Sequence, residues 1–149
     1  MKPDVHNKLL TAAHSTPVRE QVGALIWRRR RGRREVLLIT SRQTRRWIIP
    51  KGWTIAGKSA AAAARIEAWE EAGVAKSVCS RKPIGLVDYS KRLKSGRYAP
   101  CLIHVYLLRV RRLVADYPEK FERRRLWVSP DKAARLVREP ALKAILRQM

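Results

Sequence analysis

Three glutamates within five residues, Glu67, Glu70 and Glu71, are the part of this sequence best suited to chemistry. On a helix these positions are i, i+3 and i+4, so the three side chains leave one face and repel one another unless a cation lies between them. Carboxylate oxygens are the ligands that Mg²⁺ prefers. The commoner explanation of such a run is a solvated helix face. The spacing alone therefore indicates a Mg²⁺ site without deciding for it.

The flanking segments favour the metal site. The stretch from Trp47 to Ile49 predicts a short strand, and Pro50-Lys51-Gly52 ends it. The alanine-rich segment from Ser59 to Ala72 predicts a helix with Ser59 as its N-cap. Gly73 follows that helix as its left-handed terminating residue. A loop and a helix are thus expected to meet at the glutamates.

The stretch from Pro50 to Val74 resembles the signature of the Nudix hydrolases, Gly-x5-Glu-x7-Arg-Glu-U-x-Glu-Glu-x-Gly-U, where U is a bulky aliphatic residue. Counted from Gly52, the three glutamates of the helix, the final glycine and the final aliphatic residue all match. Two positions depart: Lys58 stands where the signature has its first Glu, and Ile66 where it has Arg. Ala68 is smaller than the usual residue.

The two departures are interpreted as one coupled replacement. In the family the signature Arg and the first Glu are understood to pair, so losing only one would leave a poorly compensated charge. Losing both, as at Lys58 and Ile66, leaves none. The replacement bears on how rigidly the glutamates are held, and therefore on rate.

The resemblance implies a role for each matching residue. Glu67 and Glu71, with the Gly52 carbonyl and Glu70 nearby, would hold Mg²⁺, with Mn²⁺ as an alternative. Glu70 would accept a proton from the water that attacks phosphorus. Substrate binding is assigned to six further residues: Arg42, Arg46, Lys51, Trp53, Lys58 and Lys91.

Two glutamates outside the signature also bear on the site. Glu119 and Glu122 lie before the last predicted strand, where some family members place another catalytic carboxylate. Ion pairs of these two residues with Lys120 and with Arg123 to Arg125 are the favoured interpretation. Trp53 is expected to stack on a base or simply to pack beside the loop.

The formal net charge of +22 is the second strong signal. Such a field attracts polyanions and says nothing about the fold. The basic residues punctuate apolar segments in several clusters, which predicts a basic surface on a folded domain: 28–31, 33–34, 42–46, 91–97, 109–112 and 123–125. RNA or another polyanion is therefore a candidate partner, besides a polyphosphorylated small molecule.

The order of predicted elements indicates an α/β fold. Strands are expected at 21–27, 35–40, 47–49, 84–89, 101–110 and 126–128, and a C-terminal helix begins at Ser129-Pro130 and breaks near Pro140. Together with the resemblance, this order predicts a Nudix-type α/β/α sandwich around a mixed sheet. Residues 1–19 are expected to form a polar arm, and residues 20–149 the single domain.

Composition adds expectations about the compartment. No apolar run approaches the roughly 20 residues of a membrane span, and the first residues lack a secretory pattern, so a cytoplasmic protein without a membrane partner is expected. Cys79 and Cys101 are expected to be free thiols, the latter buried. His104 is expected to be packed or hydrogen-bonded, and His6 and His14 to lie in the arm. The oligomeric state stays open.

Three functions follow. The leading one is a Mg²⁺-dependent pyrophosphohydrolase, and within the family the block from Thr40 to Trp53 is similar to the diphosphoinositol-polyphosphate and diadenosine-polyphosphate phosphohydrolases. The second is a catalytically weak Nudix domain that binds nucleotide or RNA. The third is a basic ribosome- or nucleic-acid-associated protein with structural glutamates. Retention of all three repelling carboxylates favours the first.

Overall fold

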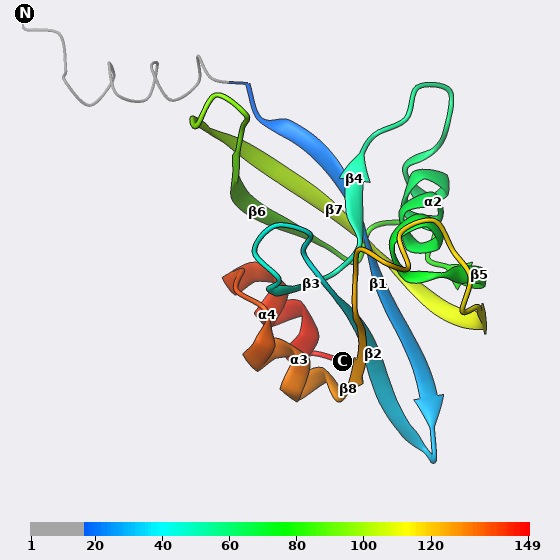
Figure 1. Ribbon diagram of the computed structural model, residues 1–149. Helices are drawn as coiled ribbons and strands as arrows, with labels where there is room; N and C mark the ends of the chain where they lie inside the picture. The colour runs from blue at the N-terminus through cyan, green and yellow to red at the C-terminus, as the bar shows by residue number, and fades with distance from the viewer. Residues whose placement is uncertain (1–16) are drawn as a thin grey trace, which may run out of the picture.

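A mixed sheet with helices on both faces forms the body of the protein (Figure 1). The computed structural model describes residues 17–149, so most of the predicted arm, with His6 and His14, lies outside the described residues. The elements follow in the order β1 (Arg19–Arg30), β2 (Arg33–Thr40), β3 (Trp47–Ile48), β4 (Lys51–Trp53), α2 (Ala60–Ala72), β5 (Val74–Cys79), β6 (Gly85–Arg92), β7 (Tyr98–Leu113), β8 (Arg125–Val128), α3 (Pro130–Leu136) and α4 (Pro140–Arg147).

The sheet has the strand order β3-β2-β1-β7-β5, with β4, β6 and β8 paired to β1, β7 and β2 respectively. The central strand β1 runs parallel to β7 and antiparallel to β2 and β4. The N-terminal half of β1 pairs with β4, and its C-terminal half forms a hairpin with β2. The two ends of β1 therefore serve two different regions of the molecule.

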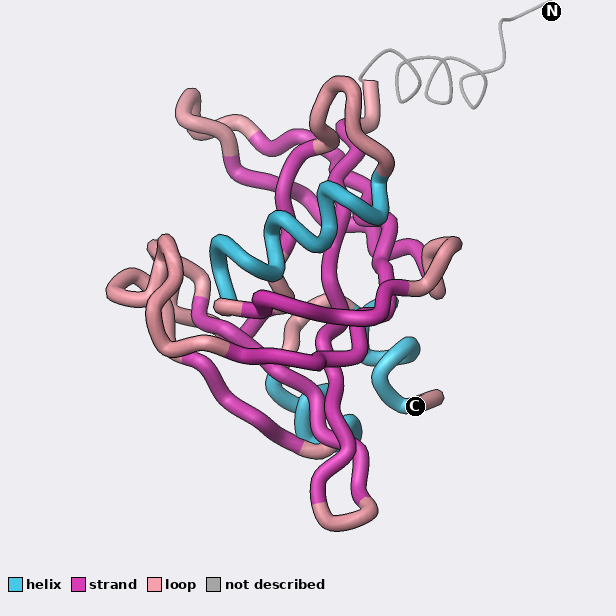
Figure 2. The backbone as a smooth tube through the Cα atoms, turned by 90° about the vertical axis from the view of Figure 1, so that its right-hand side faces the viewer, coloured by secondary structure: helices cyan, strands magenta, loops and turns pink. Residues whose placement is uncertain are grey.

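The core has two layers, one on each face of the sheet. Ile26 and Leu37 lie in the layer beneath α2, whereas Leu25 and Val36 lie in the layer covered by α3 and α4. Neighbouring residues of a strand point to opposite faces, so buried strands between two helical layers are apolar throughout. Figure 2 shows the helices on either side of the strands. The predicted α/β/α sandwich around a mixed sheet is confirmed.

Local signals in the sequence set several boundaries as expected. Arg31 and Gly32 both have positive φ and form the two-residue turn between β1 and β2, a geometry that matches strand twist. Ser129 caps α3 by accepting a hydrogen bond from the Lys132 N–H (3.2 Å), with Pro130 at its start. Pro140 begins α4, so the predicted break is confirmed.

The structure also adds two strands that the sequence interpretation lacked, β4 and β5. Cys79 and Cys101 are free thiols, and Cys101 is buried, as expected. His104 Nε2 lies 3.4 Å from Glu20 Oε1, which agrees with a hydrogen-bonded strand histidine. None of the helices within residues 17–149 is long and apolar enough to cross a membrane.

Candidate active site

Helix α2 carries the three glutamates, and both of its ends are held in place. At its start the Ser59 hydroxyl accepts a hydrogen bond from the Ala62 N–H (3.1 Å). At its end Gly73 is left-handed, with φ of 73°, and a Cβ added there would lie 2.6 Å from Tyr117 Cδ1. Only glycine satisfies both the conformation and the close approach. The direction in which the glutamates leave the helix is therefore well defined.

Glu67 lies directly against the backbone of β4. A Cβ built on Gly52 would meet Glu67 Oε1 at 2.2 Å, so any side chain at residue 52 would displace this carboxylate. Gly52 does not have positive φ, and its requirement for glycine is therefore one of space. The loop glycine and the first helix glutamate of the predicted signature are brought together, as the sequence indicated.

Glu71 is buried, with 6% of its surface exposed, and both of its oxygens have partners. Oε1 accepts a hydrogen bond from Arg123 Nη2 (2.7 Å), and Oε2 accepts one from the Lys51 N–H (2.9 Å). Arg123 also donates through Nη1 to the carbonyl oxygen of Thr40 (3.1 Å). A buried arginine thus joins the helix to the end of β2, and sequence reasoning had not assigned it to the site.

Glu119 brings a fourth carboxylate to the cluster. Its N–H donates to the carbonyl oxygen of Glu70 (3.0 Å), and its Oε1 accepts a hydrogen bond from Arg123 Nε (3.1 Å). The expected ion pair with Arg123 is confirmed. The expected pairing with Lys120 is wrong, because Lys120 binds Asp116, four residues before it (2.8 Å). Both the backbone and the charged side chain of Glu119 therefore hold it at the site.

The remaining loop glutamate, Glu122, is exposed, and it has no ion-pair partner within residues 17–149. It therefore lies outside the buried network.

The surroundings of the cluster favour the protonated form of its carboxylates. Burial raises the pKa of Glu67 to about 7, and the negative charges of Glu71, Glu70 and Glu119 add to the effect. Burial also raises the pKa of Glu71 to about 7, although Arg123 and the Lys51 N–H oppose the rise. Carboxylates shift in this direction where a hydrophobic or acidic surrounding disfavours their charge. A bound cation would remove that penalty.

Two of the predicted binding residues, Lys51 and Arg46, belong to a second cluster of polar side chains beside β4. Burial, followed by repulsion from Arg46, lowers the pKa of Lys51 to about 8. Lys51 Nζ lies 5.4 Å from the Tyr89 ring centroid, and Tyr89 donates a hydrogen bond to Gln21. Arg46 is held by Glu139, with Nη1 2.8 Å from Oε1. No sequence motif identifies Tyr89, Gln21 and Glu139 as neighbours of the site.

The other predicted binding residues lie nearer the surface. Trp53 is 43% exposed, and Lys91 Nζ is 5.5 Å from its ring centroid, so the indole has a basic neighbour. Arg42 Nη1 lies 3.8 Å from Glu119 Oε1, which brings it to the edge of the carboxylate cluster. Lys58 is exposed in the turn before α2. These roles in substrate binding stay predictions.

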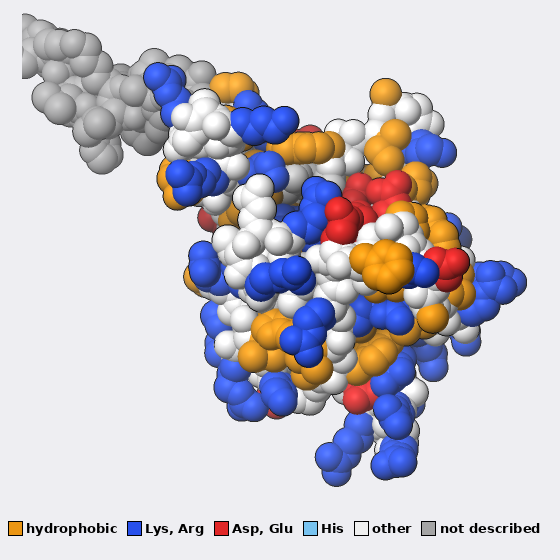
Figure 3. Space-filling model, in the orientation of Figure 1, with side chains coloured by type: hydrophobic (Ala, Val, Ile, Leu, Met, Phe, Trp, Pro, Cys, Tyr) orange, Lys and Arg blue, Asp and Glu red, His pale blue; other side chains and the backbone are white. Residues whose placement is uncertain are grey.

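The residues present fit a hard divalent cation. Neither Glu67 nor Glu70 has an ion-pair partner within the described chain, and Figure 3 shows several acidic side chains gathered beside α2 on a surface that is mostly basic. No three acidic, histidine or cysteine side chains among residues 17–149 already converge as a metal-binding set. Mg²⁺ suits such a site, because it keeps several waters and needs only one or two carboxylates besides substrate phosphates.

Comparison with known proteins identifies the family. The family profile of the NUDIX domain matches residues 18–149. The chain therefore belongs to the Nudix hydrolase family. Among curated proteins it is similar to Nudix hydrolase 13, mitochondrial, of Arabidopsis thaliana, with 31% identity over 77% of this chain and 61% of the relative. Nudix hydrolase 12, mitochondrial, of the same plant is 30% identical over 77% and 60%. The chain thus spans about three fifths of these relatives.

Solved structures support the fold. The Ap4A hydrolase of C. elegans superposes with a TM-score of 0.62 and 21% identity, over 89% of this chain and 96% of that one. A NUDIX hydrolase from Nitrosomonas europaea gives a TM-score of 0.62 and 20% identity, over 88% and 87%. Identities at this level establish a shared architecture.

Proposed function

We propose that this protein is a Mg²⁺-dependent pyrophosphohydrolase. Its substrate class is a dinucleoside polyphosphate, a diphosphoinositol polyphosphate or a related nucleoside diphosphate derivative, and the bond cleaved is a phosphoanhydride. The observation that carries the proposal is the contact between Glu67 and Gly52, because it places a carboxylate that has no ion-pair partner among residues 17–149 against a backbone that has room for no side chain. Glu70 and Glu71 leave the same helix beside it.

The carboxylates of Glu71 and Glu67 differ in how freely they can bind a cation. Both Glu71 oxygens already accept hydrogen bonds, so this residue has only its remaining lone pairs to offer a cation. Glu67 has no such partner among the described residues and would be the principal ligand, with the Gly52 carbonyl beside it. Mg²⁺, or Mn²⁺ in its place, would supply neutralisation of phosphate charge and a more acidic water at neutral pH.

Glu70 is the group that accepts a proton in the reaction. It is half-buried and has no ion-pair partner in the described residues, while its backbone carbonyl is fixed by the Glu119 N–H. A carboxylate held by its backbone but free at its side chain can receive the proton of an attacking water. The attack forms a bond from water oxygen to phosphorus and breaks the bridging P–O bond, and the leaving phosphate carries the electron pair away.

Positive charge for the substrate lies on either side of this centre. Lys51 lies two residues before Trp53 in β4, Lys91 of β6 has its Nζ 5.5 Å from the Trp53 ring centroid, and Arg42 lies at the edge of the carboxylate cluster. Each contact between a cationic side chain and a phosphate oxygen is a charge-assisted hydrogen bond. Arg46 and Lys58 complete the proposed binding set. Arg46 would bind phosphate either while it is paired with Glu139 or after that ion pair opens. A chain of phosphates suits a site with so many separate cations.

One observation favours a second function, a catalytically weak Nudix domain that binds nucleotide or RNA. Ile66 replaces the signature arginine in the middle of α2, and Lys58 replaces its partner. The relatives in Arabidopsis are named as mitochondrial, and the cytoplasmic location expected from the sequence stays a prediction.

The test is release of phosphate or nucleotide from a panel that includes diadenosine tetraphosphate, a diphosphoinositol polyphosphate and a nucleoside diphosphate sugar. Each substrate is assayed with Mg²⁺, with Mn²⁺ and with chelator. Metal-dependent turnover of one class supports the proposal. Binding of these ligands without turnover in either metal would overturn it in favour of the second function.

A further inference from the structure

A second basic region lies at the other end of β1, away from the glutamates. Trp27 is five residues beyond Val22, the partner of Gly52 across β1 and β4, and five strand residues span roughly 17 Å. Ile26 faces α2, so Trp27, its neighbour, faces the side covered by α3 and α4. The glutamates of α2 are on the opposite side of the sheet. The two regions therefore cannot hold the same phosphate group.

Two arginines from neighbouring strands converge on the Trp27 ring. The guanidinium carbon of Arg34, in β2, lies 5.5 Å from the ring centroid, and that of Arg109, in β7, lies 5.0 Å from it. Arg29 is the cross-strand partner of Arg34 and so shares its face. Cations at these distances over an indole are in the range of a cation–π contact. Three strands thus build one aromatic and arginine-rich surface, which we call the Trp27 platform.

The charges of the Trp27 platform are not compensated by the described chain. Arg29, Arg34 and Arg109 have no ion-pair partner within residues 17–149, whereas Arg28 on the other face is paired with Glu35 (2.9 Å). Like charges gathered around one ring repel one another. An anion placed among them would relieve that repulsion.

An apolar pocket of about 260 Å³ opens beside the same ring. Its wall combines Trp27 and Arg34 with Ile84, Leu107, Ile145 and Met149, together with Gln148, and contains no acidic side chain. A flat aromatic ring, apolar walls and a flanking guanidinium match the two faces of a nucleobase and the phosphate next to it. The pocket therefore has the chemistry of a base-binding site.

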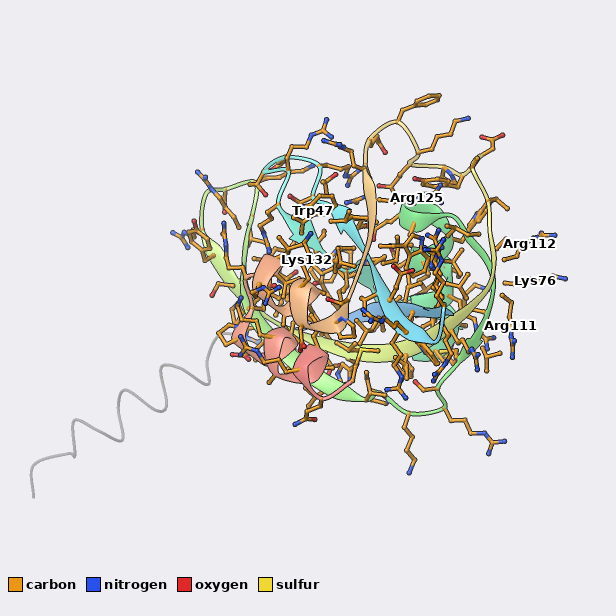
Figure 4. All side chains as sticks on the ribbon, turned by 90° about the horizontal axis from the view of Figure 1, so that it is seen from below. Trp47, Lys76, Arg111, Arg112, Arg125 and Lys132 are labelled. Atoms are coloured by element: carbon orange, nitrogen blue, oxygen red, sulfur yellow. The ribbon has the colours of Figure 1, made fainter. Side chains whose placement is uncertain are left out.

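The basic surface continues well beyond one pocket. The hairpin turn adds exposed arginines at 30, 31 and 33, and Figure 3 shows basic side chains over the hairpin tip at the foot of the molecule. Figure 4 shows Lys76, Arg111 and Arg112 pointing outward at the β5 edge of the sheet, so further cations lie outside the Trp27 platform. A single nucleotide would leave most of these charges unused. A polymer with regularly spaced phosphates would engage them.

We propose that the Trp27 platform is a binding site for single-stranded nucleic acid, separate from the hydrolytic centre. A base enters the pocket against Trp27, and the flanking phosphates contact Arg34 and Arg109. A duplex would keep its bases stacked and could not fill the pocket. The occupant is therefore a single strand.

The experiment measures fluorescence anisotropy of a labelled oligouridylate of about twelve nucleotides, a length within the usual range for one single-strand site. The full chain is titrated at salt concentrations from about 50 mM to about 200 mM. We expect R34A/R109A to weaken binding about tenfold and to reduce the salt slope by about 1.4, for two lost phosphate contacts. The matched control R92A/R97A removes two exposed arginines, the last residue of β6 and the residue before β7, and should change both quantities less.

Stacking is separated from charge by Trp27 variants and a second probe. W27L should weaken oligouridylate binding about fivefold or more and leave binding of heparin, a polyanion without bases, unchanged. W27F, which keeps an aromatic ring, should retain most of the affinity. Hydrolysis of a small substrate should be unaffected in all of these variants.

Equal effects of R34A/R109A and R92A/R97A would overturn the proposal, as would equal loss of heparin and oligouridylate binding in W27L. If W27L does not fold, the arginine pair, its control and W27F still decide the question.

Discussion

Arg123 Nη2 lies 2.7 Å from Glu71 Oε1, and the two residues are separated by 52 positions in the chain. Their side chains are 5% and 8% exposed, so this is a buried ion pair. The same nitrogen lies 3.0 Å from Glu119 Oε1. Arg123 thus holds together two carboxylates that would otherwise repel each other. They lie beside a cluster that already carries several negative charges. It is a positioning residue, since it reaches the reacting groups only through Glu71 and Glu119.

Removing this arginine should destabilise the protein and impair metal use. R123L leaves Glu71 buried without its counter-charge, and breaking a buried pair from one side costs about 3–5 kcal/mol. The free energy of unfolding is measured by denaturant titration, with R124A, an exposed neighbour, as the control. A purely structural role would leave the Mg²⁺ concentration for half-maximal rate unchanged in the folded fraction. We expect that concentration to rise.

Glu70→Gln should reduce turnover by about 10²-fold or more, because the amide keeps the shape of the side chain and removes the base. Thermal unfolding should be little altered, since Glu70 has no side-chain partner in the described residues. Glu122→Gln is the matched control: it removes the same charge from an exposed loop position near the site. Wild-type turnover in the Glu70 variant would show that the base has been assigned to the wrong residue.

Gly52→Ala tests the contact that carries the proposed function. The added Cβ would meet Glu67 Oε1 at 2.2 Å, so the carboxylate must move away from the β4 backbone. We expect a fall in metal-dependent rate of about tenfold or more without unfolding, because a ligand displaced by about 1 Å already costs much of the rate. Shortening the carboxylate in G52A/E67D should recover part of the loss. An alanine at residue 52 with full activity would contradict a site built on this contact.

The stability of the metal-free protein should depend on pH through Glu67 and Glu71. Their pKa values rise from an ordinary 4.5 to about 7, first because of burial. Between these pH values the folded protein keeps protons that the unfolded chain releases, so the free energy of unfolding falls as pH rises. In chelator the melting temperature should therefore drop from about pH 5 to about pH 7.5, and added Mg²⁺ should oppose the drop. Glu67→Gln should flatten the profile. A flat wild-type profile in chelator would refute the cause.

The parts of the site that the sequence predicted are local in the chain. Ser59, the glutamates and Gly73 act within one helix, so their spacing alone determines how they face one another. Arg123 and Glu119 come to the site from a loop some 50 positions later, and no short pattern joins them to α2.

The missed strands have the same explanation. β4 has only three residues, and its pairing with β1 is a tertiary contact. β5 follows Gly73 at once and alternates weakly, with Lys76 and Ser77 in its middle.

The last prediction concerns Lys58 and Ile66, the two departures from the signature. Lys58 is exposed before α2 and Ile66 is half-buried within it. If a Glu–Arg pair has been replaced as a unit, Lys58→Glu and Ile66→Arg should each lower stability alone, whereas the double variant should lose less than the sum. Contacting residues couple by about 0.5–3 kcal/mol, and the four proteins of the cycle are compared by denaturant unfolding. A parallel cycle with Lys58→Gln removes the new negative charge and should show no such coupling. Any variant without Lys58 should also show a raised KM if this lysine binds phosphate. Additive free energies in the first cycle would mean that the two positions do not interact. The two departures from the signature would then be unrelated.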